Sequence, residues 1–288
     1  VDNGKVVDEH THIDVISRCI NPYKDYEEYL SLAKNPDFRF IVSNTTEAGI
    51  VYEDDNKLSD APANSFPAKL TALLYERFKE RLPGFIILSC ELIDHNGEEL
   101  LKCCKKYALK WELGEDFGLW LERENSFCST LVDRIVTGFP RDEHKALEER
   151  IGQSDNMMDT AEIFHLWVIQ GNHEDELPLQ KAGFNVVWTD NVDPYKKRKV
   201  RILNGAHTSM VLAARLYGLE TVGECMKDGR VSSLLRKSAF EEIIPTIGDT
   251  EDNRKFGEAV FERFANPFIK HQLLSIALNS VSKFRARV

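Results

Sequence analysis

The sequence predicts a fold in two parts, an α/β unit followed by a unit built almost entirely of helices. In residues 1–195, short apolar runs alternate with helical patterns, which is typical of a parallel sheet covered by helices. Long helical patterns dominate residues 196–288. The chain has 288 residues, of which 42% are hydrophobic, so it is long enough and apolar enough to build two cores. We therefore predict a domain boundary between residues 195 and 196.

The α/β half opens with alternating apolar and polar residues over 1–18, which predicts a pair of strands with a turn at Asn3-Gly4. The compact apolar segment FRFIVS at 38–43 predicts a strand, and the continuous apolar segment FIILSC at 85–90 predicts a strand that is buried on both faces of a parallel sheet. Polar turns follow both strands, at the edge of the sheet where ligands bind in this architecture. The other elements predicted here are helices at 26–32, 67–81 and 97–111, and a strand pair within 163–192.

The second half is predicted to be helical because its apolar residues recur every three to four positions. The predicted helices lie at 204–217, 232–244, 252–264 and 267–284. Gly218 is expected to end the first of them.

Composition narrows the classes of function. The formal net charge of −10 argues against a surface that binds nucleic acid, but a few local cations can still hold an anionic small substrate. No apolar run is long enough to cross a membrane, and the first residues do not resemble a signal peptide. The six cysteines form no CxxC pair, which argues against a zinc site and favours reduced thiols in a cytoplasmic protein. We therefore expect no nucleic acid, membrane or metal as a partner, and the oligomeric state stays open.

One string, KVRILNGAH, combines residues that suit carbonyl chemistry: Lys199, Asn204 and His207. Reduction of a ketone needs a proton donor at the developing alkoxide and hydrogen bonds that stabilise it. A lysine can donate the proton if burial or a nearby cation lowers its pKa. We expect Lys199 to precede a helix that Asn204 caps, with His207 on the same face as Asn204. From the residues alone the structural interpretation is the stronger one: a cap, a packed histidine and a lysine in a basic run.

Four strings change this balance, because together and in order they resemble the long-chain mannitol dehydrogenase family of polyol and sugar-acid oxidoreductases. The strings are TTEAGI at 45–50, VDRIV at 132–136, K-x4-N-x2-H at 199–207 and RFANPFIKHQLLSIAL at 263–278. Within the family, SNTTEAGI at 43–50 and SCELIDHNG at 89–97 resemble the tagaturonate reductase branch. The resemblance implies a Rossmann-like first domain, a helical second domain and a site in the cleft between them.

The resemblance also implies an activity. It implies a metal-free, NAD-linked interconversion of tagaturonate and altronate, a reaction of hexuronate catabolism. Lys199 would then be the general acid and base, Asn204 would stabilise the oxyanion, and His207 would bind substrate hydroxyls. Asp133, the aspartate of VDRIV, would lie where cofactor and substrate meet. The turn expected to contact the cofactor consists of Thr45, Thr46 and Glu47.

Two features depart from the family pattern. Polyol-oxidising relatives have an asparagine where this chain has Leu92, so we name Asn96 as the candidate that replaces it at the substrate. The family's glycine-rich loop, which holds the cofactor pyrophosphate at a helix N-terminus, has no counterpart, because no GxGxxG string occurs. We therefore expect a first domain without its glycine-rich unit, a truncated helical domain and a chain that is part of a longer protein. The residues themselves do not separate NAD from NADP.

Cations near the end of the chain suit an acidic substrate. Lys270 and Lys283 are candidates for binding the carboxylate of a uronate, which a neutral sugar lacks. A solvated helix face is the alternative for both. The leading hypothesis is tagaturonate reduction. The alternatives are a fructuronate or polyol dehydrogenase of the same family and a non-catalytic binding module that has lost the cofactor loop. Leu92 and the late cations argue against the polyol version.

Overall fold

The computed structural model describes residues 5–46, 48–268 and 271–288. The chain divides into two compact units. The sheet unit consists of His10–Val132 and Leu166–Val192, and the helical unit consists of Val1–Glu9, Asp133–His165 and Asp193–Val288. The predicted boundary between residues 195 and 196 concerns domains that fold independently, and it stays a prediction.

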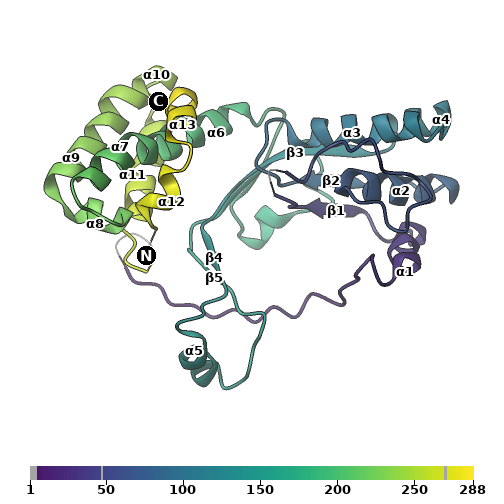
Figure 1. Cartoon of the computed structure of the whole chain (residues 1–288), viewed down its shortest axis with the longest axis horizontal. Coiled ribbons are helices and arrows are strands. Elements are labelled where there is room, and N and C mark those ends of the chain that lie inside the picture. The colour runs from purple at the N-terminus through teal and green to yellow at the C-terminus, as the bar shows by residue number, and fades with distance from the viewer. Residues whose placement is uncertain (1–4, 47, 269–270) are drawn as a thin grey trace. The chain divides into compact units, whose positions relative to one another are not determined.

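A five-stranded sheet forms the centre of the sheet unit, and the strands are ordered β1-β2-β3-β6-β7 (Figure 1). The strands are β1 (Phe40–Ser43), β2 (Ile86–Ser89), β3 (Ser126–Asp133), β6 (Leu166–Gln170) and β7 (Val186–Thr189). The pairs β1–β2, β2–β3 and β6–β7 are parallel. Strand β2 is buried along its whole length, as its uninterrupted apolar sequence predicted. The predicted α/β arrangement is therefore confirmed.

The sheet unit also contains helices. They are α1 (Tyr26–Ser31), the short 3-10 helices η1 (Leu32–Lys34) and η2 (Leu179–Ala182), α2 (Phe66–Lys79), α3 (Asn96–Lys110) and α4 (Glu115–Arg123). Helix α2 begins where the sequence allows it, because Ser65 Oγ accepts from the backbone N–H of Ala68 and Pro67 occupies the first turn. The core between α2, α3, α4 and the sheet includes Leu70, Leu74, Ile87, Leu100, Phe117 and Leu121.

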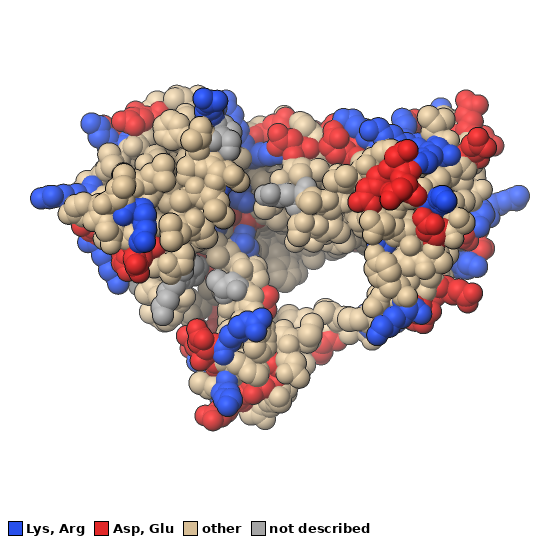
Figure 2. All heavy atoms as spheres, viewed as in Figure 1, with Lys and Arg blue, Asp and Glu red and all other residues tan. Residues whose placement is uncertain are grey.

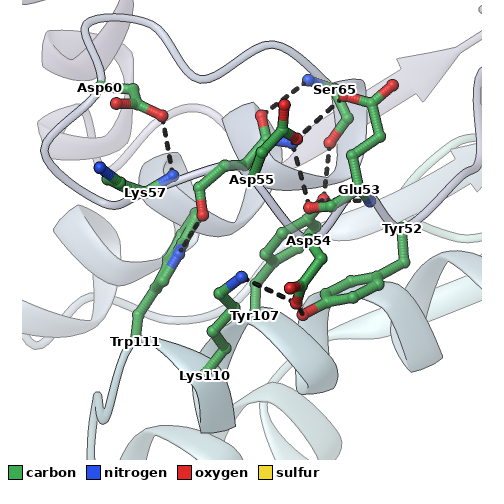
Figure 3. A network of polar contacts seen from close by, with 11 residues as sticks. Tyr52, Glu53, Asp54, Asp55, Lys57, Asp60, Ser65, Tyr107, Lys110 and Trp111 are labelled. Atoms are coloured by element: carbon green, nitrogen blue, oxygen red, sulfur yellow. Dashed lines mark hydrogen bonds and ion pairs between the residues drawn. The ribbon is translucent and has the colours of Figure 1, made fainter.

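A loop between β1 and α2 is held against α3 by aromatic side chains (Figure 3). The buried Tyr107 hydroxyl accepts a hydrogen bond from the Glu53 N–H at 2.9 Å, donates to the Glu53 carbonyl at 3.0 Å and lies 2.9 Å from Ser65 Oγ. Trp111 Nε1 donates to the carbonyl of Asn56 at 3.1 Å. These bonds satisfy backbone groups that the loop would otherwise leave unpaired in the interior.

The helical unit is built mainly from residues 193–288 (Figure 1). Its elements there are α6 (Asp193–Arg198), the π-helix η3 (Lys199–Asn204), α7 (Gly205–Leu216), α8 (Val222–Lys227), α9 (Gly229–Lys237), the π-helix η4 (Ser238–Ile243), α10 (Ile244–Ile247), α11 (Glu251–Phe264), α12 (Leu273–Ala277) and α13 (Ser280–Arg287). The segment 133–165 adds a two-stranded antiparallel sheet of β4 (Val136–Gly138) and β5 (Thr160–Ala161), and α5 (His144–Ile151). The core of the helical unit includes Ile202, Met210, Val211, Leu235, Ile244, Val260 and Phe264.

Two predicted elements are wrong. Residues 5–18 form no strand, because apolar side chains such as Val15, which is 84% exposed, find no sheet to pack on in the described part of the chain. The predicted turn at Asn3-Gly4 lies outside the described residues. The single helix predicted at 267–284 is two short helices, α12 and α13, because Asn279 between them has a left-handed backbone with φ of 58°.

The surface carries both basic and acidic side chains, as the 37 basic and 47 acidic residues of the sequence require. On the face shown in Figure 2, basic and acidic side chains are interspersed. Among the described residues, no helix is both long and apolar enough to span a bilayer. The same residues hold no cluster of three or more histidine, cysteine, aspartate or glutamate side chains that could bind a metal ion.

The Tyr107 contacts predict a loss of stability. Replacing Tyr107→Phe leaves the Glu53 N–H and the Ser65 hydroxyl without this partner in a buried place, so the free energy of unfolding should fall by about 1–3 kcal/mol. Urea titration followed by circular dichroism measures the change. The control is Tyr217→Phe, because Tyr217 is 53% exposed. Equal effects of the two substitutions would show that the hydroxyl of Tyr107 does not stabilise the loop.

Candidate active site

Lys199 begins a widened turn inside one continuous helical segment. Helix α6 leads directly into the π-helix η3, which leads into α7. In an α-helix, residues five positions apart are rotated by about 140° from each other, whereas the i→i+5 hydrogen bonds of a π-helix place such residues about one turn apart and so closer to the same side. The π-helix therefore turns Lys199 and Asn204 towards one side. Gly205 follows, and a Cβ there would lie only 2.8 Å from the carbonyl oxygen of Arg287, so a larger residue would push α13 away.

The prediction that Asn204 caps a helix is wrong, and so is the prediction that Lys199 precedes one. Asn204 has helical dihedral angles, with φ of −73° and ψ of −32°, and its side chain makes no capping hydrogen bond. The preceding residues are already helical, so their carbonyls take the place of a side-chain cap. The Asn204 carboxamide forms no hydrogen bond within the described part of the chain, which leaves it available to a ligand.

Four largely buried charged side chains of the helical unit form a connected cluster that includes Lys199. Lys199 Nζ lies 3.6 Å from Asp133 Oδ1, and the exposed fractions of the two side chains are 15% and 5%. Arg263, near the end of α11, makes a bidentate pair with Asp133, with distances of 3.1 Å from Nη1 to Oδ2 and 3.0 Å from Nη2 to Oδ1. Arg263 also binds Glu162 through Nε at 3.1 Å and Nη2 at 2.8 Å. We call Lys199, Asp133, Arg263 and Glu162 the charge quartet.

The charge quartet sets the protonation of Lys199. Burial lowers the pKa of Lys199 because the neutral amine loses less hydration than the ammonium. Asp133 and Glu162 oppose this by attracting the ammonium, and Arg263 adds to it by repulsion. The net direction is downward, towards the range in which a lysine can both give and take a proton.

His207 is a neutral imidazole with one unused nitrogen. It is 7% exposed, its ring stacks on Phe264 at 4.0 Å, and its edge meets the ring of His271 at 5.2 Å. Burial lowers the pKa of His207 to about 3, and the positive potentials of His271 and Arg263 act in the same direction. Its Nε2 atom is buried and has no hydrogen-bond partner among the described residues. A buried polar atom without a partner is costly, so Nε2 indicates a place for a ligand group.

The arrangement suits proton transfer to a polar ligand. Lys199 supplies a group whose charge can change, and the carboxylate of Asp133 stabilises its charged form. Asn204 and His207 supply uncharged hydrogen-bonding groups, and Arg263 acts electrostatically on both Lys199 and His207. The helical unit thus holds Lys199, Asn204, His207 and Asp133, four of the residues named from the sequence.

The turn after β1 belongs to the sheet unit. The buried Glu91 carboxylate accepts from the Thr45 N–H at 3.0 Å, from Thr45 Oγ1 at 2.9 Å and from Ser43 Oγ at 3.0 Å. The hydroxyl proton of Thr45 is therefore engaged, and Thr45 shapes the turn. Thr46 is exposed and has φ of 71°. Glu47 lies outside the described residues.

Asn96 was named from the sequence as the candidate that replaces the asparagine of polyol-oxidising relatives at the substrate, but its carboxamide is used within the sheet unit. Its Nδ2 donates to the carbonyls of Glu91 at 2.9 Å and Thr130 at 3.0 Å. Its Oδ1 accepts from the N–H groups of Gly97 at 3.0 Å and Thr130 at 2.9 Å. Because both donors and both acceptor positions of the carboxamide are used, Asn96 fastens α3 to the ends of β2 and β3. We therefore leave Asn96 out of the candidate site.

Of the two late cations, Lys283 is described and Lys270 lies outside the described residues. Lys283 is half-buried, and its Nζ donates to the carbonyl of Ile276 at 2.9 Å. An ammonium has three donors, so two remain for other groups.

Sequence reasoning missed Glu162, Arg263 and His271 as parts of the site. One signal was present: Arg263 lies among Val260, Phe261 and Phe264 on the apolar pattern of α11, where a charged residue needs a partner. No sequence signal identified Glu162 as that partner, because it lies about a hundred residues away along the chain.

Comparisons with known proteins identify the family to which the chain belongs. Residues 3–181 match the family model of the mannitol dehydrogenase Rossmann domain, and residues 191–288 match that of the mannitol dehydrogenase C-terminal domain. Altronate oxidoreductases of Yersinia enterocolitica serotype O:8 and Escherichia coli O7:K1 are each 51% identical over 294 aligned residues. These alignments cover 100% of this chain and 61% of each relative, so the chain spans less than two thirds of their length.

Solved structures show the same fold. A D-sorbitol dehydrogenase in substrate-free form superposes with a TM-score of 0.78 at 25% identity, over 91% of this chain and 56% of that one. Pseudomonas fluorescens mannitol 2-dehydrogenase, in a ternary complex with NAD and D-mannitol, superposes with a TM-score of 0.70 at 21% identity, over 89% and 55%. The chain therefore belongs to the mannitol dehydrogenase family, with its Rossmann domain in residues 3–181 and its C-terminal domain in residues 191–288.

Proposed function

We propose that the protein containing this chain is an NAD-dependent oxidoreductase that interconverts tagaturonate and altronate, with Lys199 as general acid and base. The observation that carries the proposal is a buried lysine, 3.6 Å from a buried carboxylate, on a chain 51% identical along its whole length to altronate oxidoreductases. The identity supports a sugar acid as the substrate, and the lysine supports proton transfer at its oxygen.

Lys199 acts in both directions of the reaction. In reduction, its ammonium gives a proton to the ketone oxygen, which becomes the hydroxyl of the product. In oxidation, the neutral amine takes the hydroxyl proton, and Asp133 stabilises the ammonium that forms. A pKa lowered by burial keeps both forms of Lys199 accessible nearer neutral pH, which a reversible proton carrier requires.

Asn204 and His207 orient the substrate. The Asn204 carboxamide donates to the oxygen on which negative charge develops, and the π-helix places it on the side of Lys199. Because His207 stays neutral, its unpaired Nε2 makes a directional hydrogen bond to a substrate hydroxyl and carries no charge to the site.

Part of the sheet unit fits a nicotinamide dinucleotide. The exposed Thr46 follows β1 at the carboxyl edge of the parallel strands, where dinucleotides bind. A Cβ on Gly97 would lie 2.6 Å from the backbone of Cys128 and Ser129, so α3 starts in close contact with this edge. In this architecture the pyrophosphate binds where the order of the strands reverses. The described strands follow one another in chain order, so the described residues account for the turn that contacts the cofactor but not for the pyrophosphate site. We propose that Thr45, Thr46 and Asp133 lie at the cofactor, which supplies the hydride when bound.

The protein, expressed from its complete coding sequence, tests the proposal directly. Loss of NADH absorbance is followed with tagaturonate, fructuronate and fructose side by side. Fast turnover of tagaturonate alone is the expected result. Preference for fructuronate or fructose would assign a different substrate, and no turnover of any of the three would refute the enzymatic function.

Lys199→Ala should lower kcat by roughly 10² to 10⁴, with a smaller change in KM, because it removes the proton donor but few binding contacts. Added primary amines should restore part of the activity if the missing group is the amine itself. Lys197→Ala is the control, because Lys197 is an exposed lysine two positions earlier. An unchanged kcat in Lys199→Ala would remove Lys199 from the mechanism.

Lys283→Ala should raise KM for uronates without a matching rise for neutral ketoses, because the carboxylate loses a cation. Steady-state kinetics with tagaturonate and fructose measures the difference. The exposed Arg285, replaced by alanine, controls for the loss of one positive charge from α13. Equal effects on acidic and neutral substrates would rule out recognition of the carboxylate by Lys283.

The state of His207 can be measured through stability. Its pKa is about 3 in the folded chain and its ordinary value is 6.5, so unfolding takes up a proton between these pH values. Stability from the neutral ring is therefore present above pH 6.5 and is lost as pH falls. Between about pH 5.5 and 4, the free energy of unfolding should fall by about 1.4 kcal/mol per pH unit more in the wild type than in His207→Gln. His12→Gln, at an exposed histidine, should keep the wild-type slope; the same slope in His207→Gln would mean that His207 is charged when folded.

A further inference from the structure

Glu162 is a buried carboxylate to which the proposed reaction assigns no role. It is 6% exposed and accepts three hydrogen bonds: from the Ile135 N–H at 2.7 Å and from Nη2 and Nε of Arg263 at 2.8 and 3.1 Å. Glu162 is therefore a firmly held carboxylate of the charge quartet that includes Lys199.

Local backbone pairing fixes where Glu162 lies. Its N–H donates to the carbonyl of Ile135 at 3.0 Å, which continues the pairing of β4 with β5 by one step. The Glu162 side chain then accepts the Ile135 N–H, and Arg134 Nε donates to the Glu162 carbonyl at 2.9 Å. The carboxylate is thus aimed at Arg263 by the two-stranded sheet that directly follows Asp133.

Arg263 links Glu162 to Lys199. Four of its five N–H donors are used, two towards Glu162 and two towards Asp133, and the ring of Phe164 lies 4.1 Å from the guanidinium carbon. A guanidinium held on two edges and one face has little freedom to turn, so it holds the Asp133 carboxylate in one orientation. Asp133 presents Oδ1 to both Arg263 and Lys199, at 3.0 and 3.6 Å.

The charges also balance. With Lys199 protonated, two cations meet two carboxylates, and each positive group has a negative neighbour. Without Glu162, the charge of Arg263 would be compensated by Asp133 alone. The potential at Lys199 would then be more positive, because the attraction of Glu162 for the ammonium would be lost while the repulsion by Arg263 would remain.

We propose that Glu162 is a positioning residue of the reaction: through Arg263 it fixes the orientation of Asp133 and the balance of charge around Lys199. This inference rests on the proposed role of Lys199. It gives Glu162, which lies outside the K-x4-N-x2-H string, the role of stabilising the protonated form of Lys199. The charged groups that act on Lys199 include Asp133 from β3, Arg263 from α11 and Glu162 after β5.

The test reads the protonation of Lys199 without turnover. Trace acetylation with acetic anhydride across a pH series, followed by mass spectrometry of the peptide that contains Lys199, gives the pH at which the amine becomes reactive. In Glu162→Gln the neutral amine should become more available, so Lys199 should acetylate at least about twofold faster at a pH below the wild-type midpoint. The matched control Glu149→Gln removes the same charge from an exposed position on α5 and should leave Lys199 unchanged. Glu162→Asp keeps the charge and should stay nearer to the wild type.

Arg263→Gln gives the opposite sign. Two carboxylates without the guanidinium should hold the ammonium more firmly, so Lys199 should acetylate more slowly than in the wild type. If Glu162→Gln does not fold, as judged by circular dichroism, this variant carries the test. Lys199 reactivity that is unchanged in Glu162→Gln, or unchanged in Arg263→Gln, would overturn the inference.

Turnover separates the inference from the proposed function. As pH rises, Glu162→Gln should lose its tagaturonate reductase activity at a lower pH than the wild type does, because the ammonium of Lys199 deprotonates earlier. A wild type without any turnover would refute the proposed function, whereas an active wild type with an unshifted Glu162→Gln profile would refute only the role of Glu162.

Discussion

The helical unit is organised around a constraint on burying charge. A single ionised side chain is too costly to place in a protein interior, so a buried lysine must be accompanied by groups that stabilise its charge. Here the accompanying groups come from three distant parts of the sequence: Asp133 ends a strand, Glu162 follows a two-stranded sheet and Arg263 closes a helix. The fold of residues 133–165 against α11 therefore provides the charged neighbours that accompany Lys199 in the interior.

Backbone geometry adds a second constraint at the same place. The π-helix brings Lys199 and Asn204 to one side, and Gly205 leaves the space that the end of α13 occupies. Opening one turn of a helix sacrifices the regular hydrogen-bond ladder, and such turns occur frequently at functional sites. In this chain the widened turn carries the lysine and the amide, while the regular helix that follows carries His207.

Much of the architecture could be predicted from the sequence, because apolar periodicity reflects burial directly. The strands FIVS and IILS and helices α2, α3 and α11 lie within about two residues of their predicted bounds, since each has a clear apolar face or run. The strands predicted at 1–18 failed because alternation alone does not supply a neighbouring strand. The long helix at 267–284 failed because an asparagine in the left-handed region interrupts it.

The candidate site was predictable only where residues are close in sequence. Lys199, Asn204 and His207 share one helical segment, so their spacing and their resemblance to the family pointed to them together. Their geometry was not predictable, because nothing in KVRILN indicates a π-helix. Arg263 and Glu162 were missed because a buried ion pair is a tertiary contact that leaves no local pattern. Asn96 was misjudged for a related reason: its polar groups are used by backbone atoms of β2 and β3, which only the folded sheet brings together.

We infer that burial and three charged neighbours together set the protonation of Lys199. The most direct test of this inference is a pH titration of the protein labelled with carbon-13 at the lysine Cε, with the Lys199 signal assigned from its absence in Lys199→Arg. We expect Lys199 to titrate at a lower pH than an ordinary lysine side chain. A Lys199 signal that titrates in the ordinary lysine range would contradict this inference.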